Sequence, residues 1–389
     1  MRKLGAPAAT LTLLVGLLAG LSPSPAGASY DDERAEQRRA VPQLRVTTVA
    51  NNLDIPWDVR PIGEGRLLFT ERTRAKLTMI EADGDLRTIN FPSEKVWTSG
   101  ETGLMGLAID PGFAENRRIY TCQGWKLGGG KKDIRVIAWK MNKGLTATTE
   151  PKVLVKGLPT VSGRHGGCRL LMAKNGALLV GTGDAAQTKN PQSLRSFGGK
   201  TLRLNPQNGK PWPSNPWAGR EGRKRYIYTY GHRNVQGLAQ RADGTLWSVE
   251  HGTYRDDEIN KLGARRNFGW RPGPGYNESP PMTNFSIPGR QWGAVWSSGN
   301  PTIATSGADF VAGKGWGSLK GTLAVGCLAG SRLMFVKLTA EGELRWTKAP
   351  SRLRDFGRLR GVTAYRGGLL VTTSNGGGND KILRVRPAR

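Results

Sequence analysis

Short apolar runs rich in Leu, Val and Thr recur along the chain, and a glycine turn opens most of them. Uninterrupted apolar runs of this length between turn signals are typical of buried β-strands, whereas an amphipathic helix repeats its apolar positions every three or four residues. No long window shows that helical period. The runs occupy residues 65–70, 118–122, 176–181, 244–249, 321–326 and 368–373. The pattern therefore predicts an all-β protein of buried strands, with the run before His251 as an inner strand.

The six runs start roughly every 60 residues, the kind of regular spacing expected of a repeated structural unit. Such units predict a six-bladed β-propeller of four-stranded antiparallel blades, whose loops converge at one end of a central channel. Residues 43–389 would form this domain, and residues 45–49 would close the ring as a strand against the last blade. Residues 265–299, rich in Gly, Pro and polar side chains, are expected to be a long rim loop. A pair of two-sheet sandwiches is the alternative architecture.

The first residues have the pattern of an export signal. Arg2 and Lys3 precede an apolar stretch over residues 8–21, and Ala26-Gly27-Ala28 has the small-x-small form of a cleavage site. We expect residues 1–28 to be a secretory signal peptide and residues 29–42 a flexible leader, so that the mature protein is secreted to the periplasm or cell wall. An uncleaved membrane anchor is the alternative. No later stretch approaches the roughly 18 apolar residues of a membrane span.

The net charge of the chain bears on the partners that the protein attracts and not on any reaction that it catalyses. Its 389 residues carry 58 Lys and Arg against 30 Asp and Glu, a net charge of +28. The basic residues are spread along the sequence without a dense block, which argues against a nucleic-acid partner. An exported basic protein is attracted to anionic cell-wall polymers or lipid headgroups, and a merely solvated basic surface is the simpler explanation of the charge.

The three cysteines are too few for a disulfide scaffold in a chain of this length. Cys122 and Cys168 could pair in an oxidising compartment, but their spacing alone does not establish the bond. None of the three has the close spacing of zinc ligands, so a zinc site is not expected.

Candidate chemistry gathers around the only three histidines, His165, His232 and His251, each of which lies among glycines and polar residues. A histidine at a strand end beside a channel mouth can act as a general base, because its pKa lies near neutrality. Each one also fits a satisfied structural histidine, and together they lack the spacing of a zinc motif. Arg233 and Asn234 offer a cation beside an amide, a pair suited to a polarised carbonyl or an oxyanion.

Two charged groups follow further along the chain. Arg358 and Arg360 are separated by one residue, so in a strand they would face the same side and present two planar forks to a ligand with carboxylates. A solvated edge strand is the alternative for this pair. The acidic residues 256–258 suggest a cation, and hard oxygen ligands suit calcium, although the spacing is not that of an EF-hand.

Several short motifs follow one another between about residue 45 and residue 387. They are PW at 56–57, TER at 70–72, GETGLMGLAIDPGF at 100–113, GTGD at 181–184, GKTLRLNP at 199–206, GHRNVQGL at 231–238, DEIN at 257–260 and NFGW at 267–270. In order and number these segments resemble the soluble PQQ-dependent sugar dehydrogenases, the glucose/sorbosone dehydrogenase family, and in particular its aldose sugar dehydrogenase type. The fold of that family is a six-bladed β-propeller, which agrees with the prediction from the apolar runs.

The resemblance implies an enzyme that oxidises the anomeric hydroxyl of an aldose to a lactone and passes two electrons to PQQ. His165 matches the general base, Arg233 the arginine that stabilises the reduced quinone, and Asn234 the amide at the quinone edge. Glu101 matches a position near the cofactor and the substrate. Arg358 and Arg360 match a pair that holds the carboxylates of the cofactor.

The same resemblance implies calcium. The backbone carbonyls of Gly252 and Thr253 match the ligands of an ion that would act as a Lewis acid on the quinone. Glu258 and the carbonyl of Phe268 match a second, structural calcium site. The implied partners are an aldose sugar and an electron acceptor that the sequence does not identify.

The chain departs from the family pattern at a few positions. Val235 and Thr253 stand where proline is usual, and Glu101 stands where the glucose-oxidising members have glutamine. No lysine lies near Ala329, where those members have one. Its loss predicts a weaker hold on PQQ and gives no reason to expect glucose as the preferred sugar.

Two other functions compete with the enzyme. One is a non-catalytic propeller that binds a glycan or an anionic cell-wall polymer. The other is a calcium-dependent hydrolase such as a lactonase, which would need a ring of side-chain carboxylates that the sequence does not suggest. His165, Arg233 and the Arg358/Arg360 pair favour the dehydrogenase, because a binding protein needs no such set.

Overall fold

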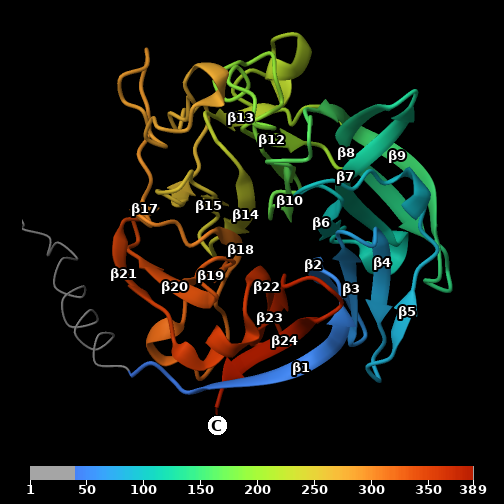
Figure 1. Cartoon of the computed structure of the whole chain (residues 1–389). Coiled ribbons are helices and arrows are strands. Elements are labelled where there is room, and N and C mark those ends of the chain that lie inside the picture. Colours follow the sequence, from blue (N-terminus) through green and yellow to red (C-terminus); the bar gives the residue numbers. More distant parts are fainter. Residues whose placement is uncertain (1–39, 389) are drawn as a thin grey trace, which may run out of the picture. The chain divides into compact units, whose positions relative to one another are not determined.

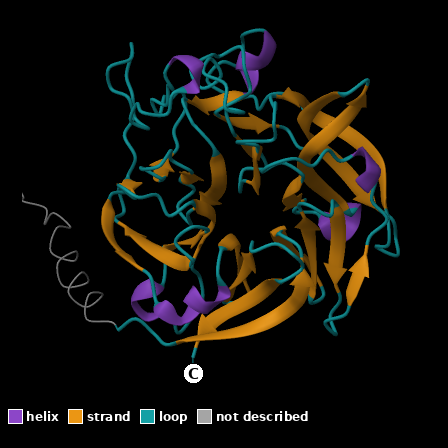
Figure 2. Cartoon of the chain, viewed as in Figure 1, coloured by secondary structure: helices purple, strands orange, loops and turns teal. Residues whose placement is uncertain are grey.

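The computed structural model describes residues 40–388, and strands dominate it (Figure 2). They form six four-stranded antiparallel sheets in a ring, which confirms the predicted six-bladed β-propeller (Figure 1). The first three blades, each written from the innermost strand outward, are β2 (Pro56–Gly63), β3 (Arg66–Glu71), β4 (Lys76–Ile80) and β5 (Leu86–Thr88); β6 (Leu104–Ile109), β7 (Arg118–Gly128), β8 (Lys131–Met141) and β9 (Thr148–Leu158); and β10 (Gly167–Met172), β11 (Leu178–Thr182), β12 (Lys200–Leu204) and β13 (Ile227–Tyr230).

The other three blades continue in chain order until the last one. They are β14 (Val235–Gln240), β15 (Leu246–Glu250), β16 (Glu258–Lys261) and β17 (Trp296–Ser297); β18 (Thr305–Phe310), β19 (Leu323–Cys327), β20 (Arg332–Leu338) and β21 (Leu344–Lys348); and β22 (Leu359–Tyr365), β23 (Gly368–Thr373), β24 (Asp380–Pro387) and β1 (Leu44–Leu53). The helical segments of the described chain are short: α2 (Phe113–Asn116) and the 3-10 turns η1 (Ser93–Lys95), η2 (Gly222–Tyr226), η3 (Pro274–Tyr276), η4 (Gly317–Leu319) and η5 (Ser351–Phe356).

The N-terminal strand closes the ring. β1 pairs antiparallel with β24, with Val46 opposite Val385, so the last blade takes one strand from each end of the domain. This confirms the expectation for residues 45–49. The predicted signal peptide and all but the last residues of the predicted leader lie outside the described residues.

The innermost strand of each blade is not the one that the apolar runs predict. Those runs are the second strands, so the prediction of an inner strand at residues 244–249 is wrong. Innermost strands approach one another closely around the ring axis, and glycine permits this. A Cβ on Gly106 in β6 would lie 2.1 Å from the carbonyl oxygen of Cys168, and one on Gly237 in β14 would lie 2.4 Å from that of Ser306. Glycine and polar residues interrupt the apolar pattern there, which hides these strands from a search for apolar runs.

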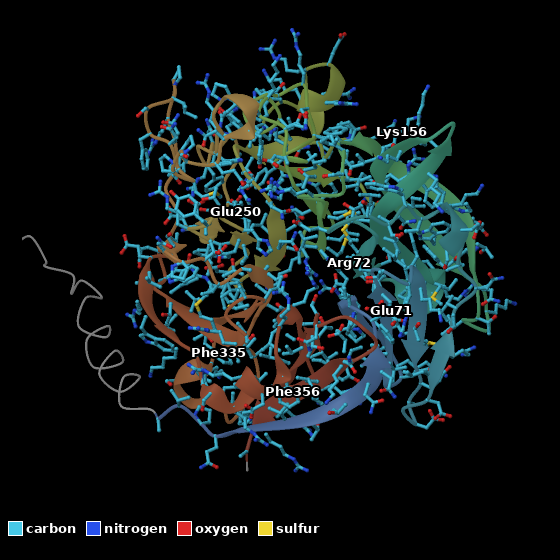
Figure 3. The ribbon with its side chains drawn as sticks, viewed as in Figure 1. Glu71, Arg72, Lys156, Glu250, Phe335 and Phe356 are labelled. Atoms are coloured by element: carbon cyan, nitrogen blue, oxygen red, sulfur yellow. A yellow bond between two sulfur atoms is a disulfide. The ribbon has the colours of Figure 1, made fainter. Side chains whose placement is uncertain are left out.

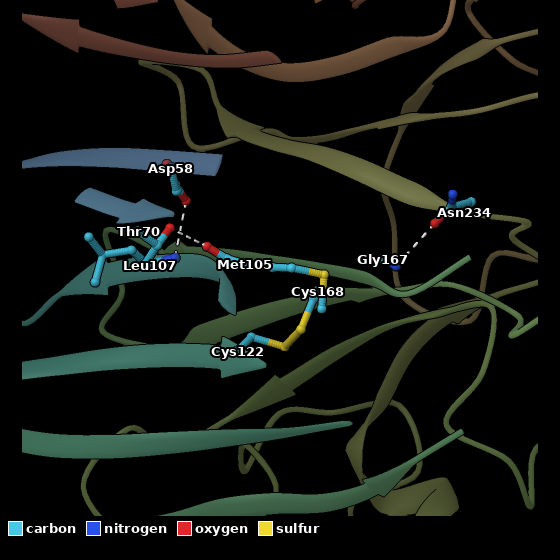
Figure 4. Close-up of a disulfide and its surroundings, with 8 residues drawn as sticks. All are labelled: Asp58, Thr70, Met105, Leu107, Cys122, Gly167, Cys168 and Asn234. Carbon is cyan, nitrogen blue, oxygen red and sulfur yellow. Dashed lines mark hydrogen bonds between the residues drawn. A yellow bond between two sulfur atoms is a disulfide. The ribbon is translucent and has the colours of Figure 1, made fainter. Parts of the chain in front are cut away.

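The hydrophobic core lies between neighbouring blades. One cluster joins Trp57 of β2 and Tyr120 of β7 to Leu170 of β10, and all three side chains are buried. Within it, Cys122 of β7 and Cys168 of β10 form a disulfide that links the second and third blades (Figure 4). The third cysteine, Cys327, is buried with a free thiol. Within residues 40–388, no helix is long and apolar enough to cross a membrane.

Candidate active site

Five of the predicted site residues lie in loops that enter innermost strands. Glu101 precedes β6, His165 precedes β10, and Arg233 with Asn234 precedes β14, while Arg358 stands directly before β22. Because rotation about the ring axis relates the blades, these loops lie at one end of the propeller. Figure 3 shows Arg72, which follows β3, near the middle of the ring. The fold therefore gathers residues that are far apart in the sequence.

His165 is held by one edge of its ring. Its Nδ1 lies 2.8 Å from Oδ1 of Asp184, and both side chains are almost fully buried. A carboxylate acceptor fixes the proton on Nδ1, which leaves Nε2 as the basic nitrogen. The backbone of His165 has a φ of +53°, a left-handed conformation that a non-glycine residue adopts only where the surroundings impose it.

Asp184 is itself fixed by three other donors. Oδ2 accepts hydrogen bonds from the Tyr276 hydroxyl at 2.7 Å and from Nε1 of Trp270 at 2.8 Å. Oδ1 also accepts from the backbone N–H of Ala186 at 2.8 Å. Sequence reasoning gave no role to Asp184, although it ends the GTGD motif, and it gave none to Tyr276, which carried no signal within the predicted rim loop. Burial and the charge of Asp184 raise the pKa of Tyr276, so this hydroxyl stays protonated and donates.

Glu101 connects the loop of His165 to Asn234. Its Oε2 accepts the backbone N–H of His165 at 3.2 Å and Nδ2 of Asn234 at 3.0 Å. The other end of the Asn234 amide, Oδ1, accepts the backbone N–H of Gly167 at 3.1 Å (Figure 4). Three blades therefore share one hydrogen-bond network around the loop of the candidate base.

Arg233 is buried and forms an ion pair with Glu278, a residue to which the sequence analysis gave no role. Nη2 of Arg233 lies 2.6 Å from Oε1 of Glu278, and Nη1 donates to the backbone oxygen of His251 at 3.3 Å. Glu278 also accepts from Arg164, with Nη2 at 2.6 Å from Oε2. Trp270, Tyr276 and Glu278 all belong to residues 265–299, so this expected rim loop contributes three side chains around His165 and Arg233.

The two arginines of the predicted pair differ in environment. Arg360 is buried, with Nε 3.1 Å from Oγ of Ser374 and Nη1 3.1 Å from Oε1 of Gln236, whereas Arg358 is exposed just before the strand. β22 is an edge strand of its sheet, as the alternative for this pair expected, but it is the innermost strand of the blade and Arg360 on it is buried, so only Arg358 has a solvated position. Burial, followed by the charge of Arg72, lowers the pKa of Arg360 to about 9. An anionic ligand would relieve this concentration of positive charge.

The other two histidines have different environments. His232 has partners at both ring nitrogens, Thr229 at 2.8 Å and Glu250 at 2.7 Å, so it is a structural residue. Nε2 of His251 is buried without a hydrogen-bond partner in the described chain. Burial, followed by the charges of Arg360 and Arg233, lowers the pKa of His251 well below its usual value, which keeps the imidazole neutral. An unsatisfied buried nitrogen beside these arginines is a candidate contact for a ligand.

The turn after β15 contains Gly252 and Thr253, the residues whose carbonyls were matched to calcium. The N–H of Gly252 donates to Oδ1 of Asp257 at 2.9 Å, and a Cβ on Gly252 would lie 2.1 Å from the oxygen of Arg255, so the turn tolerates no larger residue. Oγ1 of Thr253 is buried without a partner in the described chain. An orphaned hydroxyl beside main-chain oxygens is a donor set that fits a hard cation.

Side-chain ligands for a metal are scarce. Between residues 40 and 388, no group of three or more His, Cys, Asp or Glu side chains forms a metal site. A cation would therefore need carbonyl oxygens, or atoms of a bound ligand, in addition to one or two side chains. Glu258 lies opposite Glu250 in the sheet, and burial together with the charge of Glu250 raises its pKa well above the usual value. Thr283, which donates to Glu258 at 3.1 Å, packs beside Gly269, the residue after Phe268.

Comparisons with known proteins place this geometry in a family. Residues 53–384 match the model of the family described as glucose/sorbosone dehydrogenase. The aldose sugar dehydrogenase YliI of Escherichia coli strain K12 is 27% identical over 358 residues, which cover 88% of this chain and 93% of that protein. The PQQ-bound structure of an aldose sugar dehydrogenase from Streptomyces coelicolor is similar with a TM-score of 0.73 and 28% identity, covering 89% of this chain and 99% of the other. A putative glucose dehydrogenase structure from Thermus thermophilus gives a TM-score of 0.76 and 30% identity over 88% and 100% of the two chains. With most of its length matched by the family model and its fold shared with these structures, the chain belongs to the glucose/sorbosone dehydrogenase family.

Proposed function

We propose that this protein is a PQQ-dependent sugar dehydrogenase that oxidises the anomeric hydroxyl of an aldose to a lactone. The observation that carries the proposal is the pair of His165 and Asp184, in which Nδ1 is occupied and Nε2 is left as a base. The loop of His165 is joined to Asn234 through Glu101. Support also comes from the family and from the relative whose structure contains PQQ.

In this proposal His165 removes the hydroxyl proton of the sugar at Nε2. The positive charge that develops on its imidazole is stabilised by Asp184, whose other oxygen is held by Tyr276 and Trp270 so that the carboxylate keeps its orientation. Arg233 offsets negative charge beside the base, since its guanidinium is buried where the local dielectric is low. PQQ, when bound, supplies the acceptor for the hydride that leaves the anomeric carbon.

The arginines would hold the cofactor. PQQ carries several carboxylates, and Arg360, Arg358 and Arg72 concentrate positive charge on the same side of the site. Ala329 lies exposed in the turn between β19 and β20, so it offers no cation of its own. Arg72, whose charge acts on Arg360, is the group that we propose in place of the missing lysine.

Calcium would be held by the carbonyls of Gly252 and Thr253, with further ligands supplied by the cofactor. There it would supply Lewis-acid activation of the quinone. A second calcium at Glu258 and the carbonyl of Phe268 would compensate the buried charge of Glu258 next to Glu250. Removal of the two ions should have different effects. Removal of the calcium at Gly252 and Thr253 would abolish turnover in a protein that stays folded, whereas removal of the calcium at Glu258 would not.

Reconstitution tests the proposal. The purified apoprotein should gain sugar-dependent dye reduction when PQQ and calcium are added, and calorimetry should detect PQQ binding. His165→Ala should retain PQQ binding and lose turnover, while Glu115→Gln on α2 should behave like the wild type. Undiminished turnover of His165→Ala would remove this residue from its role. If the wild type takes up no PQQ, a non-catalytic propeller that binds a glycan or a cell-wall polymer becomes the better explanation.

We further propose that residues 1–28 direct export and that the basic mature protein contacts anionic cell-wall polymers. Its substrate would be an aldose, and a separate electron acceptor would reoxidise the cofactor. N-terminal sequencing of the secreted protein tests the cleavage site, for which Ser29 is the expected first residue. Retention of the full chain in the cytoplasm would contradict export without affecting the proposed chemistry.

A further inference from the structure

Gln236 lies on the innermost strand β14, buried between two groups that the proposed function uses. Its Oε1 accepts a hydrogen bond from Nη1 of Arg360 at 3.1 Å. Its Nε2 donates to Oδ1 of Asn234, also at 3.1 Å. One amide therefore contacts an arginine on the carboxylate side of the site and the asparagine on the side of His165.

The contact from Gln236 favours the same orientation of the Asn234 amide as the contacts from Gly167 and Glu101. Oδ1 of Asn234 receives two N–H groups, from Gln236 and from the backbone of Gly167. The amide nitrogen is then directed at Oε2 of Glu101, 3.0 Å away. A rotated amide would place its nitrogen against both donors and its oxygen against the carboxylate, and each of these contacts would be unfavourable.

The same glutamine limits the guanidinium of Arg360. Nη1 is held by Gln236, Nε by Ser374 at 3.1 Å, and the ring of Trp57 lies 5.8 Å from the guanidinium carbon. The backbone of Gln236 is fixed as well, because its carbonyl oxygen accepts Nε of the buried Arg169 at 2.7 Å. Arg169 forms a buried ion pair with Asp58 at 2.9 Å. The backbone of Gln236 is therefore held by an arginine whose own position is fixed.

We propose that Gln236 is a positioning residue that orients Asn234 and Arg360 together. Through this one side chain, the orientation of the Asn234 amide at the quinone edge is coupled to that of the Arg360 guanidinium, which would bind the carboxylates of the cofactor. This inference rests on the proposed function, because it concerns the same cofactor site. Gln236 itself acts through the two residues that it holds. Its contribution to cofactor binding would be pre-organisation, since free amide and guanidinium groups would otherwise lose rotational freedom on binding.

Gln236→Glu separates the two contacts. The new carboxylate still accepts from Arg360, but it has no N–H for Oδ1 of Asn234. We expect the affinity for PQQ, measured by calorimetry with calcium present, to fall about tenfold, as expected for one lost hydrogen bond within a charged network. kcat should fall with it, whereas KM for the sugar should stay within twofold. The melting temperature of the apoprotein should show that the variant is folded.

Two comparisons separate positioning from the added charge. Gln240→Glu introduces the same charge at the other end of β14, where the side chain of Gln240 hydrogen-bonds to Lys174 and Gly244, and it should leave PQQ affinity unchanged. In an Asn234→Ala background, Gln236→Glu should weaken PQQ binding by less than twofold, because no amide remains to be oriented. If Gln236→Glu binds PQQ like the wild type, or weakens binding equally in both backgrounds, the positioning role is wrong.

The outcomes also distinguish this inference from the proposed function. If the wild-type protein binds no PQQ, the proposed function fails and this inference fails with it. If the wild type binds PQQ and only the Gln236 comparison gives the contrary result, the proposed function stands. Should Gln236→Glu not fold, Gln236→Met, which has a similar volume and neither contact, replaces it and should weaken PQQ binding more than tenfold.

Discussion

The carboxylate of Glu278 bridges two arginines from different loops, with Oε1 2.6 Å from Nη2 of Arg233 and Oε2 2.6 Å from Nη2 of Arg164. Arg164 directly precedes His165, so the bridge joins the loop of the candidate base to the arginine proposed to offset negative charge. These ion pairs lower the pKa of Glu278, although burial alone would raise it. Residues 265–299 are therefore part of the site and not only its rim.

Glu278→Gln should lower kcat about tenfold without weakening PQQ binding. The two arginines contact different oxygens of the carboxylate, and the amide keeps only one of these as an acceptor, so the bridge that orients Arg233 is broken. Removal of a negative charge does not oppose an anionic cofactor. Steady-state kinetics and calorimetry measure the two effects separately. Glu115→Gln is the control with the same change in charge far from the site. A matching loss of PQQ affinity would show instead that Glu278 contacts the cofactor.

Asp184→Asn should reduce kcat by about a hundredfold or more and leave PQQ affinity within twofold. The asparagine can still fill the space, but it does not compel Nδ1 of His165 to carry the proton, so Nε2 is no longer reliably the basic nitrogen. The pH profile of kcat/KM should change in shape as well, because the carboxylate that stabilises the imidazolium is gone. An unchanged profile and rate would mean that Asp184 only supports the fold.

Lys200 should make stability depend on pH in an unusual direction. Its Nζ is buried and donates to the carbonyl oxygens of Asn190, Pro191 and Gly198 at 2.6–2.9 Å. Burial lowers its pKa to about 7, from 10.5 in an exposed lysine. Between these two values the unfolded chain binds more protons than the folded one, so the contribution of Lys200 to stability rises with pH across that window.

Lys200→Met measures this dependence. The difference in unfolding free energy between the wild type and the variant should increase from pH 7 to about pH 10 in urea titrations. At the upper end of this range the variant should be less stable by about 3 kcal/mol, because the buried carbonyl oxygens lose the two N–H groups of the neutral amine. A difference that is flat with pH would indicate that the three carbonyls keep Lys200 charged in the folded protein.

The disulfide between Cys122 and Cys168 closes a loop with a sequence separation of 46 residues. Replacing both cysteines with alanine should lower the unfolding free energy by about 4 kcal/mol, the loss of chain-entropy restriction for a loop of this length. Urea unfolding of this double variant measures the effect. Cys327→Ala provides a control for reduction, since a reducing agent should destabilise that variant by as much as the wild type. Equal stability of the oxidised and reduced proteins would contradict a structural role for this bond.

The sequence by itself determined the fold and the ring closure. The apolar runs recur at a regular spacing because the second strand of each blade packs on both faces, and that is why six of them could be counted without a structure. The sequence around His165, Arg233 and Arg360 also singled out residues that the structure places at the ends or on the innermost strands of separate blades. The innermost strands escaped detection, since Gly106 and Gly237 interrupt their apolar pattern where neighbouring backbones approach closely.

Tertiary structure alone decided the partners of those residues. Asp184, Tyr276 and Glu278 come from segments distant from His165 and Arg233, and no spacing along the chain predicts a contact between them. The tertiary structure also distinguished His232, with both ring nitrogens satisfied, from His251, with one nitrogen left unpaired in the described chain, although each lies among glycines and polar residues in the sequence. The physical reason is that local sequence sets which residues form strands and turns, whereas hydrogen-bond partners in a propeller depend on how rotation about one axis brings separate loops together.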